Sequence, residues 1–448
     1  MSVRRLLEEL DAETAGAELH DFVRRAYPIP RSLTGDGVRA TLRLVRERLL
    51  RDDAPLELRE VPTGTPVLDW TVPREWNLRE AWIVGPDGAR VVDFADSSLH
   101  VVGYSVPVHC KLSRAELDEH LHSLPDRPHL IPYRTSYWTE RWGFCLPHAQ
   151  REALPDGEYE VRIDATLADG ALTYGECVLP GATDREVLVS THVCHPALAN
   201  DNLSGIAVTA ALAARLARLE PSERRHTWRF LFVPGTIGAI AWLARNEEVV
   251  RRVAHGLVAA NLGDPGGFRY KRSRRGDAPI DRLVEVALRD LGESLEVEDF
   301  VPFGYDERQY CSPGFDLPVG SLTRTPWGRY PEYHTSADDP SFLRPEALGG
   351  SLRAYLAVAA AIEGSRRYRN LSPKGEPQLG SRGLYRSLGG DEAGRERELA
   401  LLWVLNQSDG SRDLLAVAER SGIALGHLEE AAAALLAAGL LEEIEDRR

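Results

Sequence analysis

Two histidines and an aspartate follow an apolar run that has the composition of a buried β-strand. The run covers residues 186–190, and His192, His195 and Asp201 come after it in close succession. Imidazole nitrogens and carboxylate oxygens are the usual zinc ligands of these types, so one interpretation is a metal site. The other is a plain loop, in which both histidines bond to backbone and Asp201 caps the helix that starts at Asn202.

Two later segments add residues of the same chemical type. Asp264 follows an apolar run at 256–260, and His334 lies in a turn-like sequence at 333–338. Side chains at the carboxyl ends of strands in an open α/β sheet meet in one crevice. We therefore expect Asp264 and His334 to approach the earlier segment, and this expectation favours the metal interpretation over the plain loop.

The elements that must position these residues alternate between residues 157 and 362. Apolar, β-rich runs lie at 186–190, 228–233 and 256–260, and helical stretches follow the first two. Such alternation is typical of β-α-β units, whose crossover helices cover a parallel sheet. We predict an α/β fold with a mostly parallel sheet and helices on both faces.

The remaining segments have different patterns. Residues 61–154 contain short strand-like pieces, broken by Pro and Gly and rich in aromatic residues, which indicates an inserted, mainly β module. Three short helices and a terminal strand predict a winged helix at 391–448, after a linker rich in Gly, Ser, Pro and Arg. The α/β domain is then expected to comprise residues 1–60 and 155–385.

The charge of the C-terminal segment argues against DNA binding. From Asp391 onward it contains 13 acidic and 6 basic residues, and the third expected helix carries no Arg or Lys. A winged helix that binds nucleic acid needs a basic surface to neutralise phosphates. We therefore expect an interaction or packing role for this segment and no nucleic-acid partner.

The overall composition is that of a folded enzyme. Hydrophobic residues make up 43% and charged residues 27% of the 448 residues, and the net charge is −14. This composition excludes dominant disorder, and the charge opposes binding to nucleic acid or to anionic membranes. No apolar run approaches the roughly 18 to 20 residues that span a bilayer. The five scattered cysteines do not form a disulfide framework. We expect a cytoplasmic protein with reduced thiols.

These motifs resemble those of the co-catalytic zinc aminopeptidase family. Its α/β core carries, in chain order, a His, a metal-bridging Asp, a Glu-Glu pair, an Asp and a final His. The resemblance implies that His192 is the first ligand, Asp201 the bridging carboxylate, Asp264 the second-metal aspartate and His334 the last ligand. It also implies zinc as the cofactor, with one or two ions.

A narrower resemblance covers nearly the whole chain. The sequence is similar to a bacterial group of aminopeptidase-like proteins that adds an inserted β module and a C-terminal winged helix and is linked to polysaccharide or natural-product gene clusters. The strings that carry this resemblance are YPIPRSLTG at 27–35, DWTVPREW at 69–76, SYWTERWGFC at 136–145, THVCHP at 191–196 and YHTS at 333–336.

The sequence departs from the family pattern where a general base is needed. The group resembled here usually has Pro-Glu-Thr-Ile-Gly after the strand that ends at Val233, but this chain has Gly235 in place of the glutamate. Thr236 stands where the peptidases have a carboxylate ligand. General acid–base assistance is worth about a hundred- to ten-thousand-fold in rate, so an ordinary peptidase mechanism would be badly impaired unless another group substitutes.

Three residues are candidates for the missing base. Glu307 and Asp306 lie in a loop that the resemblance brings towards the cleft, although Glu307 could instead be a solvated carboxylate beside Arg308. His195 is either a base or metal ligand, or a structural residue, because a neutral imidazole suits both zinc and proton transfer. Of these candidates we favour Glu307 and His195 as catalytic residues.

Other residues are candidates for substrate binding. Arg274 and Arg275 could clamp a substrate carboxylate or phosphate, or could simply lie in a solvated basic turn. The aromatic residues of 133–144 either cap the cleft or form the core of the β module.

The sequence thus predicts a zinc-dependent hydrolase that acts on an amide or peptide-like small molecule, in a biosynthetic pathway. The alternative is a catalytically silent relative that binds a ligand or a protein partner through the same cleft. No membrane or nucleic-acid partner is expected, and a homo-oligomer is one option for assembly.

Overall fold

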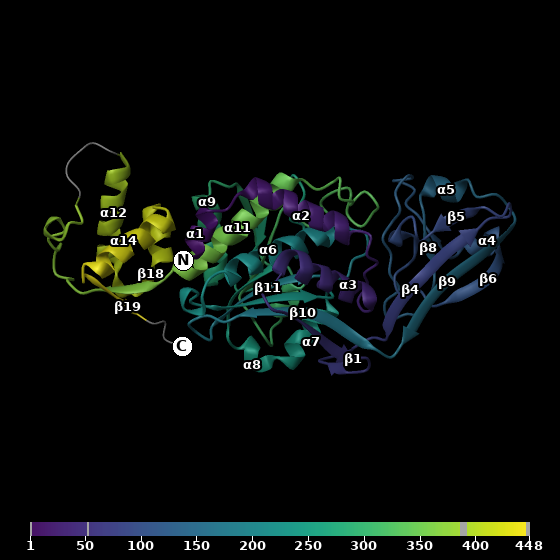
Figure 1. Ribbon diagram of the computed structural model, residues 1–448, viewed down its shortest axis with the longest axis horizontal. Coiled ribbons are helices and arrows are strands. Elements are labelled where there is room, and N and C mark those ends of the chain that lie inside the picture. The colour runs from purple at the N-terminus through teal and green to yellow at the C-terminus, as the bar shows by residue number, and fades with distance from the viewer. Residues whose placement is uncertain (1, 52, 386–391, 445–448) are drawn as a thin grey trace.

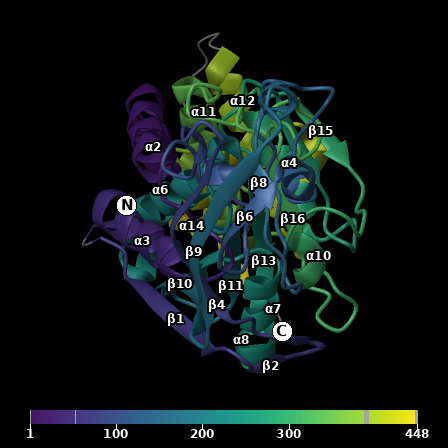
Figure 2. The same ribbon diagram turned by 90° about the vertical axis from the view of Figure 1, so that its right-hand side faces the viewer.

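The computed structural model describes residues 2–51, 53–385 and 392–444 and has three parts along its longest axis (Figure 1). A central α/β domain lies between a β-rich module at one end and a small helical domain at the other. Viewed along that axis, the strands of the module lie in front of the central sheet (Figure 2). The predicted fold class is therefore confirmed.

The central sheet is parallel in its middle and antiparallel towards its sides. Its eight strands follow the order β1-β10-β12-β11-β13-β16-β14-β15. Strands β12, β11, β13 and β16 run parallel, whereas β1, β10 and β14 join through antiparallel pairs. The strand bounds are β1 Leu56–Pro62, β10 Ala171–Leu179, β11 Glu186–His192, β12 Thr227–Val233, β13 Val253–Ala259, β14 Phe268–Lys271, β15 Leu295–Glu298 and β16 Val319–Thr323.

Helices cover both faces of this sheet (Figure 1). In strand β12, Trp228, Phe230 and Phe232 pack into one hydrophobic cluster and Leu231 and Val233 into another, as the two-residue period of a strand requires. One face carries α1 Val3–Glu8, α2 Ala12–Ala26, α3 Asp36–Val45, α6 Gly205–Ala217, α9 Pro279–Asp290 and α11 Pro345–Gly364, and the other carries α7 Ile237–Arg245 and α8 Glu247–Val250.

The β module is built around a four-stranded antiparallel sheet of order β5-β4-β9-β6. Strand β9 pairs with both β4 and β6, so the sheet extends beyond residue 154, the boundary expected from the sequence. The module contains β2 Pro66–Val67, β3 Trp70–Thr71, β4 Glu75–Val84, β5 Arg90–Asp93, β6 Val108–Ser113, α4 Arg114–Asp118, β7 Leu121–His122, β8 Phe144–Cys145, α5 His148–Glu152 and β9 Glu158–Ala168.

The sheet of the C-terminal winged helix includes a strand that precedes the linker. This sheet has the order β18-β17-β19, and β17 precedes the linker that leads to α12. Ion pairs join Arg4 to Glu429 and Arg282 to Glu419, which ties this domain to helices α1 and α9. Its elements are β17 Arg367–Asn370, α12 Glu392–Gln407, β18 Asp409–Asp413, α13 Leu414–Ser421, α14 Leu425–Ala437 and β19 Leu441–Ile444.

In the part of the chain that the structure describes, no helix combines the length and the apolar character that a membrane crossing needs. All five cysteines are free thiols.

Candidate functional site

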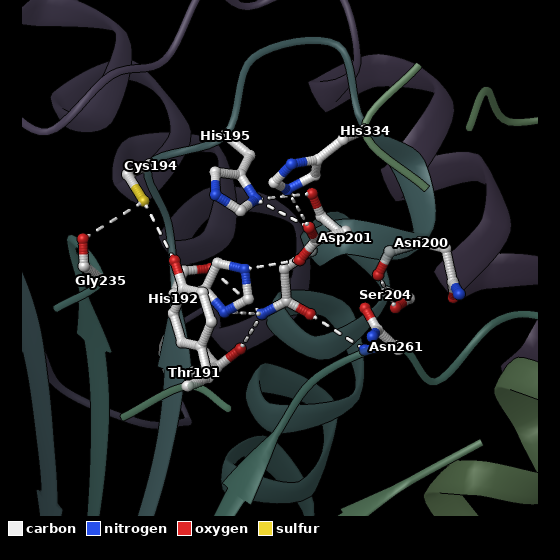
Figure 3. A network of polar contacts seen from close by, with 12 residues as sticks. Thr191, His192, Cys194, His195, Asn200, Asp201, Ser204, Gly235, Asn261 and His334 are labelled. Atoms are coloured by element: carbon white, nitrogen blue, oxygen red, sulfur yellow. Dashed lines mark hydrogen bonds and ion pairs between the residues drawn. The ribbon is translucent and has the colours of Figure 1, made fainter. Parts of the chain in front are cut away.

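Three imidazoles converge on the carboxylate of Asp201 (Figure 3). His192 is the last residue of β11, and its Nε2 lies 2.8 Å from Asp201 Oδ1. His195, in the loop that follows, places Nδ1 3.2 Å from Asp201 Oδ2. His334 comes from a distant part of the chain, and its Nε2 lies 3.0 Å from the same oxygen. The structure thus brings four of the predicted residues together.

Burial and mutual charge set the protonation of this cluster. Burial lowers the pKa of His192 to about 4. Burial also acts against a charge on His195, but the adjacent Asp201 carboxylate outweighs it and the pKa of His195 is raised. Burial opposes ionisation of Asp201, yet the three histidines hold its pKa well below the usual range. Asp201 is therefore a carboxylate that needs positive charge beside it.

A second set of residues fixes the backbone around Asp201, and the sequence did not assign them a role. Asp338 accepts hydrogen bonds from the backbone N–H groups of Asn200, at 2.6 Å, and of Asp201, at 3.0 Å. The Nδ2 of Asn202 donates to Thr191 Oγ1 at 2.8 Å and lies 3.1 Å from His192 Nδ1. Asp338 belongs to the same short motif as His334, and this position in the motif is the sequence signal that could have identified it.

The N-terminal loop at 27–35 also supports the site. Arg31 is buried, and its guanidinium donates to the backbone oxygens of His195, at 2.8 Å, and of Ala26, at 2.6 Å. This loop carries the first of the strings that distinguish the sequence, and the structure gives it a physical role. It holds the loop with His195 against helix α2.

Asp264 lies beside the cluster but makes other contacts. Its carboxylate accepts hydrogen bonds from the Thr325 hydroxyl at 2.5 Å, from the Gly266 backbone at 2.9 Å and from Asn200 Nδ2 at 3.1 Å. Within the described residues, the compact group of potential metal ligands contains His192, His195 and Asp201 and does not include Asp264. The assignment of Asp264 as a second-metal ligand therefore stays a prediction.

Tyr305 occupies the space that a side chain at position 235 would need. A Cβ placed on Gly235 would lie 2.2 Å from both Cε1 and Oη of Tyr305. The Tyr305 ring stacks on His192 with ring centroids 3.6 Å apart, and its hydroxyl lies 3.5 Å from Cys194 Sγ. In this arrangement Tyr305 leaves no room for a side chain at position 235.

Glu307 and Asp306 are both buried, so Glu307 is not the solvated carboxylate that one interpretation of the sequence suggested. Glu307 forms an ion pair with Lys271 and accepts a hydrogen bond from the Tyr305 backbone at 3.0 Å. Neither carboxyl oxygen of Asp306 has a partner among the described residues. Burial raises the pKa of Asp306 well above its ordinary value.

The two arginines predicted to clamp a substrate have a different partner. Arg274 Nη1 lies 2.7 Å from Asp316 Oδ1, and Arg275 Nε lies 3.3 Å from Asp316 Oδ2. Their side chains are 43% and 45% exposed. The structure thus places Arg274 and Arg275 in an exposed ion-pair group, and their role in substrate binding stays a prediction.

A cavity of about 430 Å³ opens beside the cluster, between the β module and helix α7. His195, Cys194 and Gly235 line its inner side, and Trp70 and Trp138 of the module line its outer side. The Tyr133 ring contacts the rings of both His195 and His334, with centroids 5.2 and 4.9 Å away. Phe144, from the same aromatic run, is buried in the core, so this run contributes to both the site and the module.

The donors of the cluster fit zinc. Two or three imidazole nitrogens and one carboxylate oxygen match the ligand types of catalytic zinc sites, which use three protein ligands. The ligand atoms of His192, His195 and Asp201 all lie within 4.8 Å of one another. A divalent cation would also supply the positive charge that the Asp201 carboxylate requires.

Comparisons with known proteins agree with this fold. A Clostridium acetobutylicum protein, provisionally named a polysaccharide biosynthesis protein with an aminopeptidase-like domain, is 45% identical over 96% of this chain and 98% of its own length. A crystal structure of a provisionally named peptidase from that organism has a TM-score of 0.91 at 43% identity, covering 99% of both chains.

The central domain also resembles more distant enzymes in fold. A zinc aminopeptidase from Bacillus subtilis has a TM-score of 0.57 at 13% identity and covers 78% of this chain and 94% of its own. A family model described as winged helix-turn-helix matches residues 366–443. A second family model, described as a domain of unknown function (DUF4910), matches residues 20–365. The chain therefore belongs to this aminopeptidase-like family.

Proposed function

We propose that the chain is a zinc-dependent hydrolase that cleaves an amide bond in a small, peptide-like molecule. The convergence of His192, His195 and His334 on the Asp201 carboxylate carries this proposal. In such a site zinc polarises a substrate carbonyl and makes water a stronger acid. The biosynthetic name of the Clostridium relative supports a role in a biosynthetic pathway.

His192, Asp201 and His334 would hold a single ion. One ion is favoured because the Asp264 carboxylate is already bonded to Thr325, Gly266 and Asn200. A second ion would also lack the carboxylate that the resembled peptidases have where this chain has Thr236. His195 belongs to the same compact group of donors and is the alternative ligand.

His195 is the residue proposed to move protons. It lines the cavity, while its Nδ1 is fixed against Asp201. A proton lost by the attacking water would pass to the imidazole and then to the leaving nitrogen as the C–N bond breaks. Glu307 is less suited to this task, because Lys271 and the Tyr305 backbone already bind its carboxylate.

Elemental analysis of the purified protein tests the proposal. We expect one equivalent of zinc in the wild type and in His195→Ala, and much less in His334→Ala. Exposed His129, changed to Ala, is the matched control. Hydrolysis of N-acylated amides should be lost in His195→Ala despite retained zinc. A wild type that takes up no zinc, even when zinc is added, would contradict the proposal.

A second candidate function is ligand binding without catalysis. The observation that favours it is Tyr305, which stacks on His192 and fills the space beside Gly235. Binding of zinc and of N-acylated amides, with no product released from any of these amides over long incubation, would support this second candidate.

A further inference from the structure

The cavity beside His195 has a distinctive wall on the side of the β module. Trp70 is 44% exposed and Trp138 is 51% exposed, and their ring centroids lie 5.4 Å apart. Large exposed aromatic rings are uncommon without a function, and they bind flat or bulky apolar groups well. Ile237 and Ile240 of helix α7 extend the apolar lining. This side of the cavity fits an apolar or ring-shaped part of a ligand.

The charge of the cavity is the second observation. Among the described residues that line it, Arg308 carries a full charge, and none is an aspartate or glutamate. The Nε of Arg308 is buried and has no hydrogen-bond partner in the described part of the chain. An arginine fork suits a carboxylate or a phosphate, to which it can donate two hydrogen bonds.

The acids closest to Arg308 in the sequence do not neutralise it. Glu307 is already paired with Lys271. Asp306 has no hydrogen-bond partner for either carboxyl oxygen within the described residues, and burial outweighs the nearby charge of Arg308 and raises the pKa of this aspartate, which favours the uncharged acid. The arginines first predicted to bind substrate, by contrast, pair with Asp316. The positive charge of Arg308 therefore remains available to a ligand in the cavity.

The positive charge of Arg308 is the opposite of the charge that a substrate with a free amino terminus would require. A substrate ammonium group needs a carboxylate or several carbonyl oxygens to replace its water shell, and an adjacent guanidinium would repel it. An anionic group would instead gain charge-assisted hydrogen bonds from Arg308.

We infer that this cavity selects an anionic substrate with an apolar or aromatic group, and that Arg308 binds the carboxylate or phosphate of that substrate. The inference rests on the proposed function, since it names the substrate class of the same site. It predicts an N-blocked, anionic amide as the substrate rather than a peptide with a free amino terminus.

Calorimetric titration tests the inference with a matched pair of anionic and neutral probes and with a cationic probe that lacks their benzoyl ring. N-Benzoylphenylalanine is anionic, its amide is neutral, and phenylalaninamide is cationic. We expect the anionic probe to bind about tenfold or more tightly than the neutral one, as is typical for a hydrogen bond to a charged group. The cationic probe should bind most weakly. Equal or tighter binding of the cationic probe would overturn the inference.

Variants connect this preference to one side chain. Arg308→Gln should abolish the preference for the anion, and Arg308→Lys should keep part of it, which also guards against a folding defect in the first variant. Arg353→Gln, which removes an exposed arginine on helix α11, should behave as the wild type. An anion preference that persists in Arg308→Gln would exclude Arg308 as its source.

Two further arms identify the anion and separate this inference from the metal proposal. Phenyl phosphate, compared with benzoate, shows whether phosphate or carboxylate is preferred, and either preference supports the inference if Arg308→Gln removes it. Titrations are run on zinc-loaded protein and on protein treated with chelator. If no zinc binds but the preference at Arg308 remains, the hydrolase proposal fails while the anion site stands.

Discussion

The two halves of the candidate site differ in how their aspartates are bonded. Three imidazoles contact the Asp201 carboxylate, and Asp338 accepts two backbone N–H groups beside it. In the loop at 303–309, both carboxyl oxygens of Asp306 and the Nε of Arg308 have no partner in the described structure. A buried polar group without a partner is costly, so the second half is not built for stability alone.

The two halves also differ in where their residues lie in the fold. The ligand half depends on side chains at the ends of parallel strands, the position where α/β folds place functional groups. The other half has Gly235, with Tyr305 in the adjacent space. The proposed function therefore combines a cluster of metal-type donors with a second half in which Tyr305 takes the space beside Gly235.

Removal of the central carboxylate should give the largest effect. Asp201→Ala leaves the three imidazoles without their shared anion, and we expect zinc affinity to fall more than about 100-fold, because loss of even a residue that supports a ligand costs about 10- to 100-fold. Competition titration with a fluorescent zinc chelator measures this change.

The control for that experiment is Asp126→Asn, a carboxylate whose side chain is 74% exposed. It should leave zinc affinity unchanged. If Asp201→Ala bound zinc as tightly as this control, the first half of the comparison would be wrong and the cluster would be a polar network without a metal.

Removal of the ion pair between Lys271 and Glu307, in the second half of the site, should have the next largest effect. Glu307→Gln leaves the charge of Lys271 without its carboxylate in a site where Glu307 is fully buried. Breaking a buried pair in this way costs about 3 kcal/mol in the free energy of unfolding. Urea unfolding measures the loss, and Glu248→Gln, whose carboxylate is 86% exposed beside Arg251, should show almost none. A wild-type midpoint in Glu307→Gln would mean that the pair is solvated.

A smaller effect is expected where Gly235 meets Tyr305. Gly235→Ala places a methyl group 2.2 Å from the tyrosine ring, which must then shift. Overpacking of this kind costs about 1 to 3 kcal/mol. In the double variant with Tyr305→Ala the clash is gone, so we expect the two changes to be less destabilising together than their sum. Additive losses, measured by urea unfolding, would show that the ring does not fill this space.

The same contact explains why Gly235→Glu alone should not create an ordinary peptidase site. The family resemblance predicts that Gly235 replaces a glutamate, because the resembled group has this residue at a fixed place after the strand that ends at Val233. The contact with Tyr305, 70 residues further along the chain, leaves no local pattern, and so it was not predictable. Position within an element can be inferred from sequence, but a side-chain contact between distant loops cannot.

The fold shows the same limit. Alternation of apolar runs and helices predicted the parallel centre of the sheet, because crossover helices impose that direction. The antiparallel strands β1 and β14 contain several charged residues and no continuous apolar run, so the same pattern does not reveal them. Strand β9 lies after residue 154, the expected end of the module, yet it pairs with β4 and β6 of the module.

The smallest predicted effect concerns the unpartnered carboxyl of Asp306. Its raised pKa means that the folded protein holds a proton more tightly than the unfolded chain, whose aspartates titrate at about 3.9. Stability from this group is therefore full at low pH and declines as the pH rises above about 4. Between pH 5 and 6 the decline is at most about 1.4 kcal/mol.

Asp306→Asn cannot titrate, so its free energy of unfolding should fall less over this interval. Urea unfolding of both proteins at the two pH values measures how much the free energy of unfolding of each one falls. The histidines contribute equally to both proteins, so their contribution cancels when the two are compared. Parallel changes in the two proteins would show that Asp306 is ionised in the folded state, and its charge would then oppose the anion site at Arg308.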